Sequence, residues 1–354
     1  MIYTVALSII KNIPIKQLND LIDQTNDNKL LFTALSSRLG FKKNDVLAKA
    51  ENIIRKCRKN NIEILQSKDK SYPVELYKCV DRPIVLYKKG NGHINKKKCI
   101  SIVGTRNNTY YGKEITESLI EHLKSYNINI ISGLAFGIDI IAHRKALVER
   151  MPTFAVLGSG LLHIYPKQHQ KELDRMMELG GVISEFPPDM PPLKFHFPKR
   201  NRIIAGISSC TLLIESKAKG GGIITAKLAS SYNRDVFAVP GNINNPSSAG
   251  CNNLIQQHEA IPLTCANQLI QEIKMEKVHI NTISLPIMEQ KTTLSKNEKI
   301  IVDTIIKYQA LHIDALNQHV EIDFYMLLGL LTKLEMEGIV LKNPGNIYKI
   351  NTLT

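Results

Sequence analysis

The chain has 354 residues, 44% of them hydrophobic and 22% charged, which predicts an ordinary soluble globular protein of two or three domains. Its formal net charge of +14 favours a polyanion as partner. The longest apolar stretches, such as residues 2–10, fall short of the roughly 20 residues that a membrane span needs, so we expect no signal peptide, no anchor and no membrane contact. The six cysteines include no CxxC pair, which favours a reducing cytoplasm and argues against a bound metal.

The positive charge is concentrated in the middle of the chain. Lys and Arg outnumber Asp and Glu by nine to one in residues 78–113 and by eight to two in residues 189–234. Residues 291–354 carry seven of each sign. A polyanion is therefore expected to bind the central part of the chain.

Residues 1–75 predict a small helical domain. Apolar residues recur there at spacings of three and four, and Pro14 and Gly40 interrupt the pattern. No residue in this part indicates a chemical role.

From about residue 80 to residue 275 the pattern predicts a doubly wound α/β domain. Apolar runs bounded by glycine alternate with amphipathic helices, which is typical of a parallel sheet covered on both faces. The runs are CISIVG, INIISG, FAVLG, GVISE, CTLLIE and DVFAVPG.

Five glycine-rich turns follow strands of this sheet, and ligands bind beyond the carboxyl ends of parallel strands. The turns read GTRNNTYYG, SGLAFGID, GSGLLHIYP, ESKAKGGGIITA and PGNINNPSSAGCN. Glycine lets backbone N–H groups approach an oxyanion, and the following helix adds the positive end of its dipole. Strand-to-helix geometry alone explains any one of these turns, but five on one edge beside many cations predict a phosphate-binding rim.

The sequence lacks the usual nucleotide-binding fingerprints. The first turn is GTRNNT instead of GxGxxG, the second strand ends in Ser132 and Gly133 instead of an acidic residue, and no GxxxxGK[ST] occurs. We therefore expect no dinucleotide or other cofactor and no NTPase activity.

The densest group of cations lies in the stretch FHFPKRNRIIAG. Lys199, Arg200 and Arg202 are predicted near the start of a helix, where the dipole disfavours each cation by roughly 0.3–1 kcal/mol unless an anion lies nearby. An internal ion pair would explain one arginine, but nearby carboxylates are too few for the whole group, so we expect an external anion. Neighbouring strand ends add Arg106 and Lys167.

Two carboxylates invite other interpretations. Asp139 and His143 lie four apart on a predicted helix, a spacing that suits a metal or a proton-transfer pair, although a bond from Asp139 to the neighbouring loop is the favoured interpretation. Glu215 ends a strand where a hydrolase places a general acid, but one carboxylate is weak evidence.

The last part of the chain predicts a linker and a winged-helix domain. Residues 276–293 are polar and irregular. Residues 294–354 predict three helices followed by a hairpin that turns between Asn343 and Asn346. The third predicted helix carries one lysine and several acidic residues, so it should bind duplex DNA poorly, which argues against a sequence-specific regulator. A protein-interaction or regulatory role is expected for this domain.

The motifs of the central part together resemble the DprA family of DNA-processing proteins, also called Smf. They are IVGTR, SGLAFGIDIIAH, VLGSG with IYP, SEFP, FPKRNRIIAGIS, LLIES, IITA, VFAVPG and GCNNLI, in the order and spacing of that family. The resemblance is dense over residues 75–275. It implies a SAM-like helical domain over residues 1–75, an extended Rossmann-like domain over residues 76–275 and a winged helix over residues 294–354.

The resemblance also implies a function. Proteins of this kind bind and protect single-stranded DNA, help to load the RecA recombinase during natural transformation, form homodimers and are not enzymes. The DNA-contacting residues implied are Arg106, Lys167, Lys199, Arg200 and Arg202. The implied phosphate rim consists of Gly104, Thr105, Gly133, Gly137, Gly221 and Thr225.

Some positions differ from the family pattern, and one other function is considered. Leu162, His169 and Gly220–Gly222 replace side chains that usually hydrogen-bond around the pocket. The alternative is a nucleotide-processing hydrolase of the LOG type, whose PGGxGTxxE motif requires a catalytic glutamate. The stretch GGGIITAK has Lys227 instead, which argues against that alternative.

Overall fold

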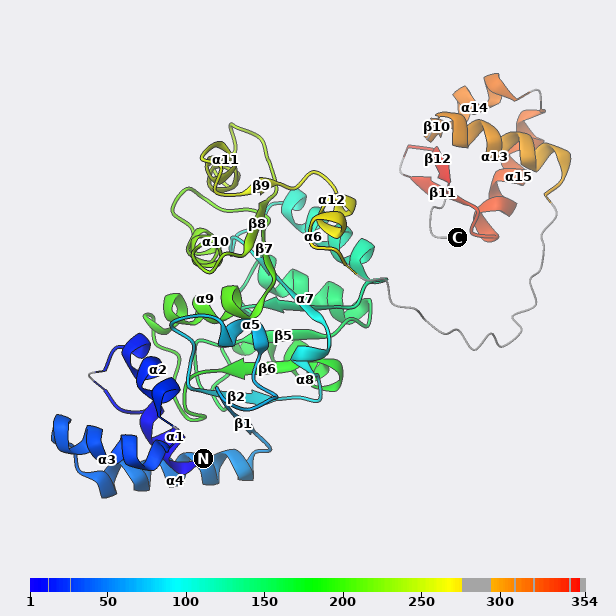
Figure 1. Ribbon diagram of the computed structural model, residues 1–354. Coiled ribbons are helices and arrows are strands. Elements are labelled where there is room, and N and C mark those ends of the chain that lie inside the picture. Colours follow the sequence, from blue (N-terminus) through cyan, green and yellow to red (C-terminus); the bar gives the residue numbers. More distant parts are fainter. Residues whose placement is uncertain are drawn as a thin grey trace. The chain divides into compact units, whose positions relative to one another are not determined.

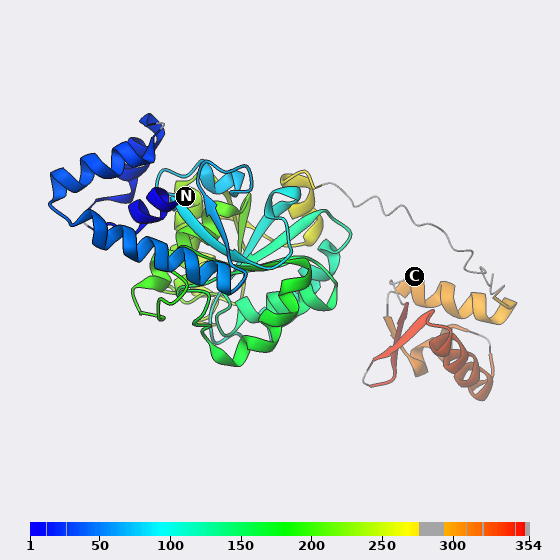
Figure 2. The ribbon, with the colours of Figure 1, turned by 90° about the horizontal axis from the view of Figure 1, so that it is seen from below.

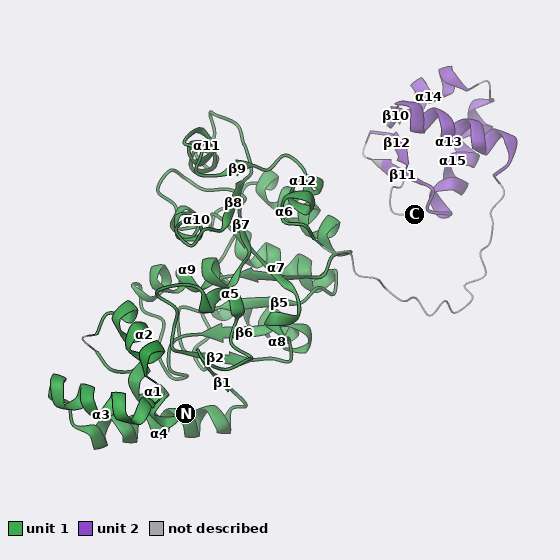
Figure 3. Cartoon of the chain, viewed as in Figure 1, with its two compact units in different colours: residues 1–279 green, residues 280–354 purple. Residues whose placement is uncertain are grey.

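The computed structural model describes residues 1–275 and 294–350, except residues 12, 26, 309, 321 and 344. The chain divides into two compact units, residues 1–279 and residues 280–354 (Figure 3). The predicted linker at residues 276–293 lies outside the described residues. No helix within the described ranges is long and apolar enough to cross a membrane.

The first unit is built on a nine-stranded, mostly parallel sheet, which confirms the predicted α/β class (Figure 1). The strand order is β1-β2-β6-β5-β4-β3-β7-β8-β9, and only the pairs β1–β2 and β2–β6 are antiparallel. The strands are β1 (Glu63–Gln66), β2 (Val85–Lys89), β3 (Lys98–Val103), β4 (Ile128–Ser132), β5 (Thr153–Val156), β6 (Gly181–Ser184), β7 (Cys210–Leu213), β8 (Asp235–Ala238) and β9 (Ile261–Pro262).

The six predicted apolar runs form β3 to β8, and β4 to β7 are buried along their whole length because helices cover both faces. One face packs against α5 (Val74–Tyr77), α9 (His196–Ile207), α10 (Gly221–Ser231) and α11 (Ala249–Gln256). The other packs against α6 (Tyr110–Leu123), α7 (Ile138–Val148) and α12 (Ala266–Glu272). Helix α8 (Gln170–Leu179) covers the end of the sheet near β6.

Four helices lie at the β1–β2 end of the sheet (Figures 1 and 2). They are α1 (Ile2–Ser8), α2 (Ile15–Gln24), α3 (Asn28–Leu39) and α4 (Lys43–Lys59). Asp27 caps α3 at its start and Gly40 ends it with φ 68°. These helices share a hydrophobic core with residues of β2, β5 and β6.

Strand β1 lies inside the range that was predicted to be helical. Its four residues include a single buried one, Leu65, so the segment has no visible alternation. The strand forms because β2 supplies an antiparallel partner, and neither strand was predicted from the sequence.

The described part of the second unit contains three helices and a three-stranded antiparallel sheet of order β10-β12-β11. The elements are α13 (Lys296–Tyr308), β10 (Ala310–His312), α14 (Ile313–His319), α15 (Phe324–Met336), β11 (Val340–Asn343) and β12 (Ile347–Ile350). It has its own hydrophobic core, which includes Ile301, Leu327 and Tyr348. The helices and hairpin occur in the predicted order, and the assignment as a winged helix stays a prediction.

All six cysteines carry free thiols. Five of them are buried, and Cys265, just before α12, is exposed.

Candidate functional site

A cleft of about 580 Å³ opens at the carboxyl ends of β3, β4 and β7. In the sheet, β3 has β4 on one side and β7 on the other, and later strands are added on both sides. The cleft therefore lies at the point where the strand order reverses. Ligands of open α/β sheets bind at such a point. Its walls come from the loop after β3, the loop after β7 and the first turns of α9.

A buried carboxylate holds the loop after β3 in place. Glu215 is 1% exposed, and its carboxylate accepts hydrogen bonds from the backbone N–H of Thr109 at 2.9 Å and from the Thr109 hydroxyl at 2.6 Å. Its backbone carbonyl accepts from the N–H of Thr105 at 2.7 Å. Glu215 therefore has a structural explanation and does not have to act as a general acid.

The loop after β4 contacts the same wall through a glycine. Gly137 has φ 78°, and a Cβ atom there would clash with the carbonyl oxygen of Thr105. The backbone N–H of Ile138 donates to that oxygen at 3.2 Å. Only glycine lets the two loops approach this closely.

Asp139 and Arg200 form a buried support under the loop after β4. Asp139 accepts hydrogen bonds from the N–H groups of Gly133 at 3.1 Å and Ala135 at 3.4 Å. The Arg200 guanidinium donates to the carbonyls of Gly133, at 2.8 Å, and Val156. Burial raises the pKa of Asp139, which the nearby Arg200 opposes, and burial lowers the pKa of Arg200 to about 10, so the arginine stays charged at neutral pH.

His143 is not part of a proton-transfer pair with Asp139. Its Nδ1 lies 2.7 Å from the hydroxyl of Thr153, which itself donates to the Ile130 carbonyl at 3.0 Å, so His143 carries its proton on Nδ1. Burial lowers its pKa to about 3. Within the described ranges, no group of three or more His, Cys, Asp or Glu side chains could hold a metal ion.

Four cations line the cleft without an internal carboxylate partner. They are Arg106, Lys194, Lys217 and Lys219; all four are exposed, and none of them forms an ion pair with another described residue. Among the residues that the structure describes, Asp139 is the only carboxylate lining the cleft, and it is buried and already bonded to the loop. The cleft is therefore strongly electropositive and suits a ligand with several negative charges.

Aromatic rings lie beside these cations. Phe136, Tyr165 and Phe197 border a small hollow next to the cleft, together with Arg106. The Tyr165 and Phe197 ring centroids are 5.6 Å apart, and the Arg106 guanidinium lies 6.0 Å from the Phe197 centroid. Phe136 and Tyr165 are 43% and 46% exposed, which leaves ring faces open for a flat ligand.

The cations predicted to contact DNA do not all line the cleft. Arg106 lines the cleft, and Lys167 is exposed beyond its border. Lys199 is exposed and lies 3.7 Å from the Glu185 carboxylate. Arg200 reaches the cleft only with its edge, since it is 5% exposed.

For Arg202 the expectation of an external anion is wrong. Its guanidinium pairs with Glu185, both side chains are 8% exposed, and it also donates to the carbonyl of Asp81. Arg202 is occupied inside the protein by Glu185, which follows β6, and by Asp81, which lies between α5 and β2, and it does not line the cleft.

The predicted rim residues lie close together. Gly104, Thr105, Gly221 and Thr225 line the cleft, and Gly133 lines the adjoining hollow. Lys194, Lys217 and Lys219 also line the cleft and were not predicted from the sequence. Lys217 and Lys219 lie in the ESKAKGGG turn, directly after a predicted strand. Their position beside the other basic turns was the signal that could have identified them.

Known proteins resemble this chain over the part that contains the cleft. The family model described as DNA recombination-mediator protein A matches residues 63–274. Protein Smf of Escherichia coli is 37% identical over 215 residues, 60% of this chain and 57% of that protein, so the match spans little more than half of it. The DNA processing protein DprA of Bacillus subtilis is 36% identical over 231 residues, 65% of this chain and 77% of that protein.

Two solved structures share the fold. DNA processing protein A of Streptococcus pneumoniae matches with a TM-score of 0.61 and 33% identity, over 74% of this chain and 87% of that one. DNA processing protein A of Helicobacter pylori, whose structure is described for its single-stranded DNA binding mode, matches with a TM-score of 0.55 and 28% identity, over 60% of this chain and 95% of that one.

Proposed function

Because the chain belongs to the DNA recombination-mediator protein A family, we propose that its cleft binds single-stranded DNA. The observation that carries this proposal is the set of four cations around one cleft that have no carboxylate partner among the described residues, beside partly exposed aromatic rings. Cations meet backbone phosphates, and aromatic faces stack on any unpaired base. A duplex keeps its bases stacked inside the double helix, so the aromatic rings of the cleft cannot stack on them.

We further propose that the protein is a mediator and not an enzyme. The side chains that suggested chemistry all have internal roles: Asp139 and Glu215 hold loops, and His143 is buried and neutral. Lys227, at the position where a LOG-type hydrolase needs its glutamate, lies 3.4 Å from Glu259. A nucleotide hydrolysis assay that detects product would contradict this part of the proposal.

In this role the protein protects incoming single-stranded DNA and helps to load RecA during natural transformation, acting in the cytoplasm as a homodimer. Six free thiols suit a reducing compartment. RecA filament formation on single-stranded DNA, measured with and without the protein, tests the loading step. Analytical ultracentrifugation tests the dimer.

The binding proposal is tested by fluorescence anisotropy of a labelled single-stranded oligonucleotide, titrated at several salt concentrations and competed with duplex of the same sequence. We expect preference for the single strand and affinity that falls steeply as salt rises. Arg106→Ala and the double variant Lys217→Ala/Lys219→Ala should weaken binding and reduce the salt slope by about one per lost phosphate contact.

A matched control is available at the start of α4. Lys42 and Lys43 are also two exposed lysines in the same unit, but they line no part of the cleft. Lys42→Ala/Lys43→Ala should bind as the unaltered protein does. Equal losses in the control and cleft variants would mean that only overall charge matters, and unchanged affinity in both cleft variants would refute the site.

A further inference from the structure

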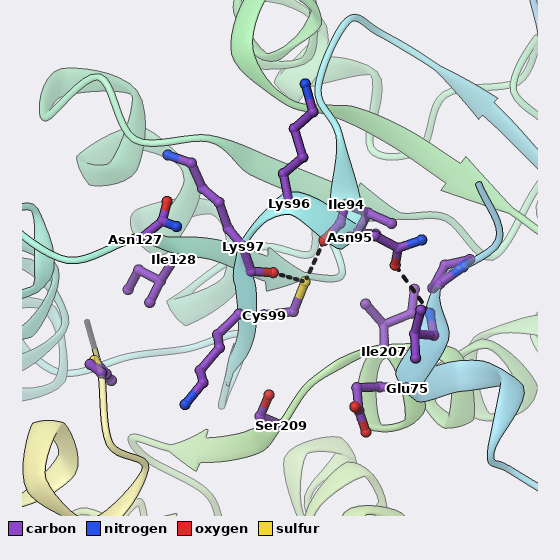
Figure 4. Close-up of a pocket in the computed structure, with 14 residues that line it drawn as sticks. Glu75, Ile94, Asn95, Lys96, Lys97, Cys99, Asn127, Ile128, Ile207 and Ser209 are labelled. Atoms are coloured by element: carbon purple, nitrogen blue, oxygen red, sulfur yellow. Dashed lines mark hydrogen bonds between the residues drawn. The ribbon is translucent and has the colours of Figure 1, made fainter. Parts of the chain in front are cut away.

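A second basic pocket, of about 410 Å³, lies at the opposite edge of the sheet (Figure 4). It is bordered by the segment that leads into β3, the start of β4 and the residues just before β7. These are the amino ends of parallel strands, so this pocket shares no lining residue with the cleft. Ligand sites of such sheets normally lie at the other edge, and the function proposed above does not use this pocket.

Three consecutive lysines border the pocket, and only one of them has an internal role. Lys98 donates to the carbonyls of Ile273 and Lys274, at 2.8 and 2.9 Å, and so caps the end of α12. Among the described residues, neither Lys96 nor Lys97 has a partner for its ammonium group. Helix capping therefore explains one lysine and leaves two cations unexplained.

Glu75, the one acidic residue among the described lining of the pocket, does not neutralise these lysines. The Glu75 carboxylate is bound on one oxygen by Arg234 at 2.6 Å and on the other by Lys78 at 2.7 Å. The pocket thus keeps an excess of positive charge, which favours an anionic ligand.

The backbone that carries the lysines is firmly anchored. The Cys99 thiol donates to the carbonyl of Ile94 at 3.5 Å, and the Asn129 amide donates to the same carbonyl at 3.1 Å. Figure 4 shows Lys96 and Lys97 projecting from this segment, Lys97 toward the side of the pocket that carries Asn127. A rigid loop with free ammonium groups lowers the entropic cost of holding an anion.

The rest of the lining suits a ring with polar edges. Ile94, Ile128 and Ile207 border the pocket with little exposed surface, since each of them is 5% exposed or less. The Asn127 amide and the Ser209 hydroxyl are half-buried and form no hydrogen bond with another described side chain or backbone group, so they can pair with a ligand. The volume falls in the range of small-molecule sites.

We propose that this pocket is a separate binding site for a nucleoside phosphate, with the polar edges of the base at Asn127 and Ser209 and the phosphate at Lys96 and Lys97. The same chemistry is presented by a free mononucleotide and by the phosphorylated end of a DNA strand. The inference does not rest on DNA binding in the cleft, because the two sites use different residues.

Isothermal titration of the full-length protein with dAMP tests the site, with inorganic phosphate as a second ligand. We expect saturable dAMP binding that weakens about tenfold in Lys96→Ala/Lys97→Ala, and that is unchanged in Lys42→Ala/Lys43→Ala and in Arg106→Ala. The altered lysines are at the surface, and equal melting temperatures would confirm that the variants fold. Asn127→Ala should weaken dAMP binding and leave phosphate binding alone.

A pair of oligonucleotides, with and without a 5′-phosphate, distinguishes the two sources. If the end of a strand is bound, Lys96→Ala/Lys97→Ala weakens binding of the phosphorylated strand more than that of the other; if a free nucleotide is bound, both strands are unaffected while dAMP binding is lost. No saturable dAMP binding would overturn the proposal. Loss of dAMP binding in Arg106→Ala alone would assign the nucleotide to the cleft, and equal affinity for phosphate and dAMP would exclude the role of the base.

Discussion

At the scale of single residues, the two arginines and the lysine of the KRNR stretch separate into structural and accessible groups. Arg202 and Lys199 lie near the same carboxylate, Glu185, but Arg202 is buried and Lys199 has a side chain that is 54% exposed. A buried ion pair that loses one partner leaves an uncompensated charge, whereas a surface pair contributes little. The two positions therefore test different properties.

Arg202→Ala should lower the free energy of unfolding by about 3–5 kcal/mol, because Glu185 would be left buried without its cation. Lys199→Ala, with the same carboxylate as partner, should change it by less than about 1 kcal/mol. Urea denaturation of both variants measures the difference. A fully stable Arg202→Ala variant that no longer binds DNA would instead place Arg202 at the interface.

His143 gives the protein a measurable sensitivity to acid. Its pKa is about 3 in the folded protein against 6.5 for the ordinary group, so the unfolded chain binds the extra proton between these values. Stability from this group is complete above pH 6.5 and is lost as pH falls toward 3, at up to about 1.4 kcal/mol per pH unit.

His143→Gln should flatten the dependence of stability on pH between about 6 and 4.5. Burial also lowers the pKa of His196, so some dependence should remain in the variant. Denaturation at a series of pH values compares the two proteins. An identical slope in both would show that His143 does not titrate in this range.

At the scale of elements, the two loops that meet at Gly137 determine the shape of the cleft. Gly137→Ala combines a positive φ with a clash against Thr105, so it should destabilise the protein by about 2 kcal/mol or more and displace the loop that carries Arg106. Gly40→Ala is the matched control, since Gly40 also has a positive φ, of 68°, and lies outside the cleft, but an added Cβ there meets no atom within 4 Å. Gly137→Ala should have the lower melting temperature and the weaker oligonucleotide binding of the two variants. Equal values in both would argue against a role for this contact.

The central sheet could be predicted from the sequence because short continuous apolar runs bounded by glycine are typical of buried parallel strands. The sequence did not predict β1 and β2, which are short and depend on each other and on β6. The strand ends located the candidate site, since parallel strands share one edge. Which cation of α9 faces the cleft could not be predicted, because the burial of Arg202 depends on a contact with Glu185, 17 positions away. Lys194, Lys217 and Lys219 were missed since isolated lysines in turns look like ordinary surface residues.

At the scale of the whole molecule, the two units have separate hydrophobic cores. Removal of residues 291–354 should leave the first unit folded and its affinity for single-stranded DNA within about twofold. Circular dichroism and anisotropy of the shortened protein would measure both. A large loss of affinity with the fold intact would show that the second unit contributes to DNA binding.

Because five cysteines are buried and one is exposed, thiol alkylation can distinguish folded from unfolded molecules. Burial raises the pKa of Cys57, Cys99 and Cys251 to about 12 and that of Cys79 to about 11, and it also raises the pKa of Cys210. Since the thiolate is the reactive form, an alkylating dye should modify the native chain once, at Cys265, and the denatured chain six times. The ratio of dye to protein would then report what fraction of a preparation is native, and every native molecule would carry its label at the same position.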